Sequence, residues 1–343
     1  MQEVLWLSNR PKLPSGLDDG CVPGPVLWGT ATCSPAQGAP EGWSWNYGGG
    51  TGLQWLDPQA VLSKLTARLS TGSSTKAILL HLHGAGCLSA DMFCRAANLA
   101  KIYGGSDLEI VPVLMSWPTG GYNPRDYVDA RRWILKDVRE LADAFRVLAK
   151  AIALRKPSVR AYLTAHSLGT HLLSQILADS AARGAEPPTP DPVFDDALLF
   201  ASDVDNNALD DGSAPAGSGL HRLDRWAKEI HVYFSPSDAV VGLSTLGQVA
   251  LPIPGRAGTA LGTSGPSPFL TQTPRGVLVE AINCGFLAAA NVGDTQHHYW
   301  RLDPLAVKDV RAVLRQIAPS RMPWRDRNLF TPSWNIFPSN LPG

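Results

Sequence analysis

The sequence predicts an α/β protein in which a mostly parallel sheet is covered by helices on both faces. Short apolar runs alternate with helix-like segments through the central part of the chain, an order typical of parallel strands joined by right-handed crossovers. The runs are apolar on both sides, as in strands buried between two layers of helices. The expected strands are 76–83, 109–117, 159–166, 193–204, 229–235 and 276–283.

Helices are expected between these runs. The first begins at Asp57 and Pro58, residue types that commonly cap a helix and fill its first turn. A long amphipathic pattern predicts one continuous helix that ends before Pro157. The expected helices are 53–69, 89–103, 125–155, 168–183 and 303–317.

The 343 residues are expected to form a single domain, 1–343. Roughly 150 residues per domain would suggest two domains, but α/β folds often run longer as one unit. Residues 1–75 are rich in glycine, proline and tryptophan, and they are expected to form an N-terminal extension of short strands and loops. Residues 319–343 are expected to form an extended C-terminal tail.

Charge and apolar content limit the class of partner. Thirty basic side chains balance thirty acidic ones, so electrostatics gives no reason to expect nucleic acid or an anionic membrane as partner. No run approaches the roughly 18 apolar residues of a transmembrane helix, so no membrane span is predicted. Glycine clusters at 48–50 and 104–105 lack the strand, helix and lysine context of phosphate loops, and no cofactor is predicted.

The five cysteines bear on the compartment. Their number is odd and no CxxC pair occurs, which argues against a disulfide framework and against a structural zinc site; no metal is predicted. The N-terminus lacks the basic start and apolar run of a secretion signal. Reduced thiols in a cytoplasmic protein are therefore the expectation.

The segment AHSLG, residues 165–169, has the sequence context of a nucleophile elbow. It follows a predicted strand and opens a predicted helix, and small residues, Ala165 and Gly169, flank Ser167 at two positions on either side. Alanine stands where glycine is usual. The helix start would direct free N–H groups at a developing oxyanion. The alternative is an ordinary strand-to-helix turn in which Ser167 only caps the helix.

A serine nucleophile needs a histidine base and a carboxylate that orients the base. In folds with such an elbow, the acid and then the base follow the serine in chain order, each beyond a strand end. Asp238 fits the acid, with Asp203 as the alternative acid, and only His297 and His298 lie downstream of Asp238. Asp238 could instead cap a turn, because SPSD is favourable turn chemistry.

An oxyanion hole needs two N–H donors. The backbone N–H of Leu168, directly after the nucleophile, is one candidate. The other is the N–H of Ala85, in the segment HGAG that follows the first predicted central strand. Glycines in this segment allow a close approach of the backbone to a substrate. The alternative is a glycine-rich turn without a catalytic role.

Several segments together resemble the serine-hydrolase group of the α/β-hydrolase superfamily catalogued as domain of unknown function 900. The resemblance covers roughly residues 5–300 and implies an α/β-hydrolase fold with a triad of Ser167, Asp238 and His297. In that family the last segment often reads His, any residue, Tyr, which favours His297 over His298. The resembling segments are LSNR, HGAG, SWPTG followed by Tyr127 and Asp129, AHSLGTHLL, ASDVD, VYFSPSDAV, GRAG and HHYW.

The leading hypothesis is a serine hydrolase that cleaves a small-molecule carboxylic ester through an acyl-enzyme intermediate. One alternative is a thioesterase or amidase that uses the same residues. Another is a non-catalytic α/β-hydrolase-like binding protein, suggested by Ala165 in the elbow and by the long loops. The sequence leaves the acyl and alcohol groups of the substrate and the oligomeric state open.

Overall fold

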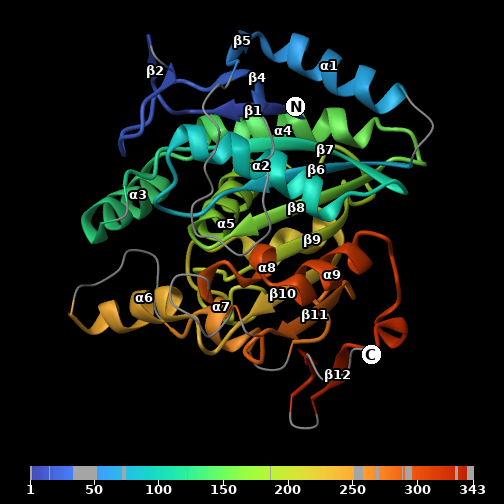
Figure 1. Ribbon diagram of the computed structural model, residues 1–343. Coiled ribbons are helices and arrows are strands. Elements are labelled where there is room, and N and C mark those ends of the chain that lie inside the picture. The colour runs from blue at the N-terminus through green and yellow to red at the C-terminus, as the bar shows by residue number, and fades with distance from the viewer. Residues whose placement is uncertain are drawn as a thin grey trace.

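The computed structural model describes residues 2–14, 16–33, 52–71, 75–121, 123–185, 187–250, 258–267, 270–287, 289, 296–328 and 331–337, without the side chains of 90 and 245–250. The tryptophan-containing stretch 41–50, the segment 251–257 with most of the GRAG motif, and the last six residues lie outside this description. One large sheet runs through the middle of the molecule (Figure 1).

Among the described residues the sheet has eleven strands, in the order β12-β13-β11-β10-β9-β8-β6-β7-β1-β4-β5. Every neighbouring pair from β13 to β1 is parallel, and the antiparallel pairs are at the two edges. The predicted mostly parallel sheet is therefore confirmed. The strands are β1 (Gln2–Ser8), β4 (Leu27–Cys33), β5 (Gln54–Leu56), β6 (Thr75–Leu82), β7 (Leu108–Ser116), β8 (Arg160–His166), β9 (Phe194–Phe200), β10 (Ala227–Phe234), β11 (Leu278–Asn283), β12 (Arg325–Arg327) and β13 (Ser333–Ile336); β2 (Lys12–Leu13) and β3 (Gly16–Leu17) form a separate small hairpin.

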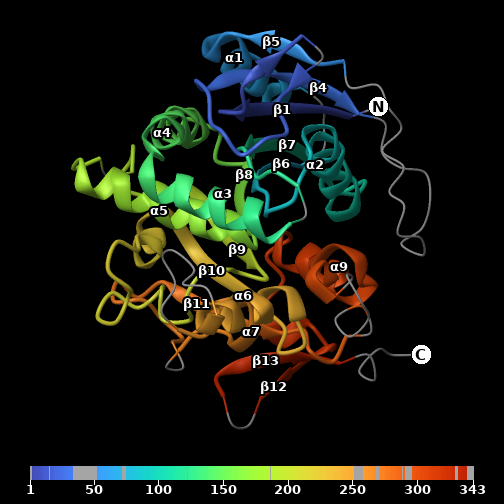
Figure 2. The same cartoon turned by 90° about the vertical axis from the view of Figure 1, so that its left-hand side faces the viewer.

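Helices cover both faces of the sheet. Figure 2 shows α3, α4 and α5 on one side, and α2 and α9 on the other. The first helix has its predicted cap, because Asp57 Oδ1 accepts the Ala60 N–H at 2.9 Å. The expected range 53–69 began too early, since residues 54–56 form β5 and pair with β4. The longer helices are α1 (Pro58–Ser70), α2 (Ser89–Tyr103), α3 (Pro124–Lys136), α4 (Arg139–Ala153), α5 (Leu168–Ala182), α6 (Ala239–Ala250) and α9 (Pro304–Val313); α7 (Leu261–Ser264) and α8 (Tyr299–Leu302) are single turns.

The hydrophobic core lies in two layers because successive side chains of a strand point to opposite faces. In β6, Ile78 and Leu80 belong to the cluster under α3, α4 and α5, whereas Ala77 and Leu79 pack under α2 and α9. All four are buried. Burial on both faces accounts for the continuous apolar run of this strand.

The prediction of one helix over 125–155 is wrong. The chain leaves the helical conformation at Asp137, with φ −154° and ψ 82°, and two helices result, α3 and α4. No glycine or proline marks the break, so no local signal in the sequence indicates it. Tertiary packing accounts for the break between the two helices, because α4 lies along α5 whereas α3 places Arg131 at the end of β9.

Both ends of the chain contribute to the sheet. At the N-terminal edge, β1 pairs with β7 and carries β4 and β5 outward; at the other edge, β13 pairs with β11 and carries β12 (Figure 1). Within the described residues, no helix combines the length and apolar character needed to cross a bilayer.

Candidate active site

Ser167 occupies a strained turn between β8 and α5. Its φ is 54° and its ψ is −123°, a backbone conformation that residues other than glycine rarely adopt. A Cβ at Gly169 would lie 2.5 Å from the His83 carbonyl oxygen, so only glycine allows α5 to start this close to β6. Ala165 is fully buried in β8. The strand, the turn and the helix thus stand in the order predicted for a nucleophile elbow.

The loop after β9 holds this turn in place. The Ser167 N–H donates to the Phe200 carbonyl at 2.9 Å, and the Asp203 N–H donates to the Ser167 carbonyl at 3.2 Å. Both hydrogen bonds involve the Ser167 backbone, and neither engages its hydroxyl group. A strained backbone conformation persists only where the surrounding structure stabilises it, and these two hydrogen bonds help to stabilise that of Ser167.

Asp238 and His297 form a buried pair. Asp238 lies beyond the end of β10, 1% exposed, and its Oδ1 accepts the Val241 N–H at the start of α6. Its other oxygen, Oδ2, lies 2.8 Å from Nδ1 of His297, which is 7% exposed. Because a carboxylate only accepts, Nδ1 carries the proton in this pair. That tautomer leaves Nε2 of His297 with a lone pair, as a general base requires.

His166 connects this pair with the serine turn. Its ring centroid lies 4.7 Å from that of His297, and its Nε2 lies 3.2 Å from the His297 carbonyl oxygen, to which it donates. Burial, and next the neighbouring His297, hold the pKa of His166 well below its usual range, so His166 is neutral. The structure records no hydrogen bond between the described side chains of Ser167 and His297; it brings them together through His166, the chain neighbour of Ser167.

His298 has different surroundings. It is half-buried before α8, and its Nδ1 has no hydrogen-bond partner among the described residues. Burial, and next the charge of Arg301, lower its pKa well below the usual range. Of the two adjacent histidines, His297 is the one hydrogen-bonded to Asp238.

The alternative acid, Asp203, is engaged elsewhere. Its Oδ2 accepts from the Tyr127 hydroxyl at 2.5 Å and from Arg131 at 2.8 Å, and its Oδ1 accepts from Ser244 at 2.9 Å. Arg131 and Asp203 are both almost fully buried. Asp203 therefore links α3 and α6 to the loop that holds Ser167.

The HGAG loop packs directly on the serine turn. A Cβ at Gly84 would lie 2.9 Å from Ser167 Cβ. The Trp117 N–H donates to His83 Nε2 at 3.2 Å, so the His83 proton is on Nδ1, which lies 2.7 Å from the Gly84 carbonyl oxygen. Burial, and next the charge of Arg10, keep the pKa of His83 well below its usual range. Since the carbonyl and N–H of a trans peptide point in opposite directions, the Ala85 N–H points away from His83.

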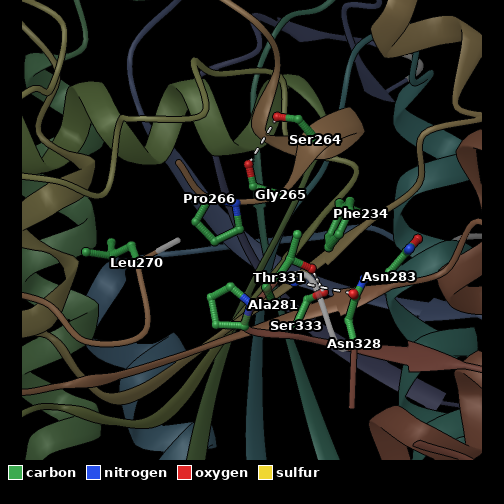
Figure 3. A pocket seen from close by; sticks show the side chains of 11 residues that line it. Phe234, Ser264, Gly265, Pro266, Leu270, Ala281, Asn283, Asn328, Thr331 and Ser333 are labelled. Atoms are coloured by element: carbon green, nitrogen blue, oxygen red, sulfur yellow. Dashed lines mark hydrogen bonds between the residues drawn. The ribbon is translucent and has the colours of Figure 1, made fainter. Parts of the chain in front are cut away.

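A cavity of about 160 Å³ lies near the carboxyl ends of β10 and β11, beside β13 and α7 (Figure 3). It shares the carboxyl edge of the sheet with Asp238, but neither Asp238, Ser167 nor His297 lines it. The described lining mixes aliphatic, aromatic and small polar groups: Phe234, Ser264, Gly265, Pro266, Leu270, Ala281, Asn283, Asn328, Thr331, Pro332 and Ser333.

A set of potential metal ligands lies toward the amino ends of β9 and β10. Ligand atoms of Asp196, Glu229 and His231 are within 4.8 Å of one another. His231 Nε2 lies 3.0 Å from Asp196 Oδ1, and the second Asp196 oxygen accepts from Gln316 at 2.6 Å. His231 Nε2 and both Asp196 oxygens are therefore engaged in hydrogen bonds.

Arg10 lies in the LSNR segment, and no role was predicted for it. Its fully buried guanidinium donates to the Cys87 carbonyl at 2.6 Å, in the loop that carries Ala85. A single arginine after an apolar strand has no local signal for burial, because arginines are mostly exposed.

A long parallel sheet, with a serine elbow after one strand and an acid–histidine pair beyond later strands, defines the α/β-hydrolase class. A model of the family described as alpha/beta hydrolase of unknown function (DUF900) matches residues 58–251. The chain belongs to this family, which confirms both the resemblance and the predicted fold.

The chain is similar to several solved structures at low sequence identity. DphMB1 is 16% identical, over 73% of this chain and 80% of that one, with a TM-score of 0.32. The carboxylesterase EstE1, from a metagenomic library, is 13% identical over 71% and 82%, with a TM-score of 0.27. A fungal esterase from Rhizomucor miehei is 12% identical over 86% and 80%, with a TM-score of 0.32. No curated protein sequence matches the chain significantly.

Proposed function

We propose that this α/β hydrolase is a serine hydrolase that cleaves a carboxylic ester, with Ser167, His297 and Asp238 as its catalytic triad. The observation that carries the proposal is the buried 2.8 Å contact between Asp238 and His297, packed through His166 against the strained turn of Ser167. The chain order and the position of each residue beyond a strand end support the same assignment.

The proposed reaction starts with attack of Ser167 Oγ on the ester carbonyl carbon. Nε2 of His297 takes the hydroxyl proton, and Asp238 stabilises the resulting imidazolium. The carbon–alkoxy bond then breaks as His297 returns this proton to the departing alcohol, which leaves an acyl group on Ser167. Water, deprotonated by His297, attacks the acyl carbon; the acid product leaves and Ser167 regains its proton.

The negative charge on the tetrahedral intermediate needs two donors. We assign these to the backbone N–H groups of Leu168 and Ala85. Leu168 is the first residue of α5, so its N–H has no partner within the helix and lies at the positive end of the helix dipole. Ala85 belongs to the loop that contacts Ser167, and His83 sets the orientation of its peptide.

The same residues could act on a thioester or an amide, and we propose carboxylic esters as the substrate class. A cytoplasmic location is part of the proposal. It is supported by the five cysteines, all of which are free thiols in the structure.

A fluorophosphonate probe tests the proposal without a known substrate, because it labels only an activated serine. Wild-type protein is expected to be labelled at Ser167, and Ser167→Ala to remain unlabelled. Ser180→Ala is the matched control, because Ser180 is also buried but lies near the end of α5; it is expected to label like wild type.

A panel of p-nitrophenyl esters, acyl thioesters and amides then defines the reaction. Ester turnover should fall by about 10⁴-fold or more in Ser167→Ala. Wild-type protein that stays unlabelled, with no turnover of any panel member, would instead support the non-catalytic binding protein. Preferred turnover of thioesters or amides would correct the substrate class and leave the triad in place.

A further inference from the structure

We propose that Arg10 is a positioning residue for the loop 84–88, called here the oxyanion loop, and that it acts from the N-terminal segment of the chain. The inference rests on the proposed function, because the oxyanion loop carries the Ala85 N–H. Arg10 lies directly beyond β1 and outside the residues 58–251 that match the family. No residue of the proposed triad contacts it in the described structure.

The first contacts fix the Cys87 peptide group. Arg10 Nη2 donates to the Cys87 carbonyl at 2.6 Å. The N–H of Cys87 donates to Thr119 Oγ1 at 3.2 Å, and Arg10 reaches the same Thr119 oxygen at 3.4 Å. Arg10 Nε also donates to Ser116 Oγ at the end of β7. The oxyanion loop is thereby attached to β1 and β7, two strands of the rigid sheet.

A second set of contacts fixes the far end of the oxyanion loop. Arg10 Nη1 lies 3.2 Å from Asp19 Oδ1, and this same oxygen accepts the Ser89 N–H at 2.6 Å. Ser89 is the first residue of α2. Arg10 therefore holds the oxyanion loop directly at Cys87 and through Asp19 at Ser89.

The burial of Arg10 makes this arrangement specific. Its side chain is 0% exposed, and a buried charge is tolerated only when its hydrogen bonds are well formed. The planar guanidinium donates to six groups in fixed directions, the four named above together with the Asp18 carbonyl and the Met92 sulfur, which a lysine ammonium cannot reproduce. Displacement of the oxyanion loop would break several of these bonds at once. The expected consequence is that the Ala85 N–H stays aligned toward Ser167.

The test compares the inactivation kinetics of a fluorophosphonate, with the maximal rate kinact separated from the binding constant KI. Loss of alignment of one oxyanion donor should lower kinact by about 10- to 100-fold. KI should stay within about twofold, because misalignment of an oxyanion donor weakens stabilisation of the transition state more than binding of the probe. Arg10→Met is the principal variant, and Arg10→Lys should recover part of the rate.

Arg325→Met is the matched control. Arg325 is equally buried and pairs with Asp309 and Glu280 at the β12 edge of the sheet. The Arg325→Met variant should have a lower melting temperature, as Arg10→Met does, and an unchanged kinact. Amide hydrogen exchange should quicken in the peptide 84–89 of Arg10→Met and not in that of Arg325→Met. If Arg10→Met does not fold, Asp19→Asn should lower kinact by about 3- to 10-fold, because Asp19 is half-exposed and its loss is milder.

The outcomes separate this inference from the proposed function. A wild type that is not labelled at Ser167 overturns the proposed function and the inference with it. A labelled wild type, together with a folded Arg10→Met that has unchanged kinact and loop exchange, overturns the inference alone. Equal loss of kinact in Arg10→Met and Arg325→Met would also overturn it, because that result reflects general destabilisation.

Discussion

Gly84→Ala adds one methyl group where the HGAG loop meets the serine turn. The new Cβ would lie 2.9 Å from both His166 Nδ1 and Ser167 Cβ, and 3.2 Å from the His166 carbonyl oxygen. Gly84 does not have a positive φ, so alanine fits its backbone conformation. The effect of the substitution therefore comes from contact alone.

The size of the effect follows from these distances. Non-bonded carbons pack at about 3.5 Å or more, so the loop or the turn must move by about half an ångström. Ser167 Cβ is fixed by a strained backbone and cannot rotate away, and overpacking of this kind costs about 1–3 kcal/mol. A shift of this order between nucleophile and oxyanion donor should lower kcat by about 10- to 100-fold.

The assay is the hydrolysis of p-nitrophenyl esters, together with the melting temperature of each variant. Gly242→Ala is the matched control, because a Cβ at Gly242 meets no atom within 4 Å. It lies within α6 and should stabilise the protein by up to about 1 kcal/mol with unchanged kcat. A Gly84→Ala variant with wild-type kcat and stability would refute the close packing of the loop on Ser167.

Two further predictions concern the acids and the pH dependence. Asp238→Asn should lower ester kcat by about 10⁴-fold with little loss of stability. Asp203→Asn should instead weaken the ion pair with buried Arg131 and lower the free energy of unfolding in urea by about 3 kcal/mol or more. A larger loss of kcat in Asp203→Asn than in Asp238→Asn would reverse the assignment of the acid. Burial, and next the charges of two arginines, lower the pKa of His81 to about 3. The unfolded chain therefore binds a proton between pH 6.5 and 3 that the folded protein does not, and stability falls as the pH falls. His81→Leu should reduce the stability difference between pH 7 and pH 5 by about 2 kcal/mol, measured by urea unfolding at both values, and an unchanged difference would contradict this.

Much of the fold could be predicted because central parallel strands carry a strong local signal. Burial on both faces requires apolar runs such as 76–83, and each such run is a strand in the structure. The break between α3 and α4 could not be predicted, because tertiary packing produces it in a segment of uniform helical pattern. The strands at the two sheet edges were also indistinct, since β5 and β12 have only three residues each.

The candidate site divides in the same way. The elbow segment was visible because small residues flank Ser167 between a predicted strand and a predicted helix. The contact that requires Gly169, where α5 starts against β6, appears only in the structure. Chain order reduced the base to His297 or His298 and the acid to Asp238 or Asp203, and the resemblance favoured one of each. In the structure His297 is the histidine that bonds to Asp238, whereas Asp203 is occupied by Arg131. These pairings are contacts between residues far apart in the chain, so no local sequence pattern predicts them.

The sequence by itself determined the parallel α/β architecture and the place of the strand–serine–helix turn, because both leave a local pattern: apolar runs for the strands, and small residues around Ser167 for the turn. Only the tertiary structure decided which side chains meet across the carboxyl edge of the sheet. Arg10 shows the difference most clearly: its five-donor guanidinium reaches Cys87, 77 positions along the chain, because β1 lies beside β7. Ser167 can thus be located from its neighbours in sequence. The residues that hold and surround it are brought together only by folding.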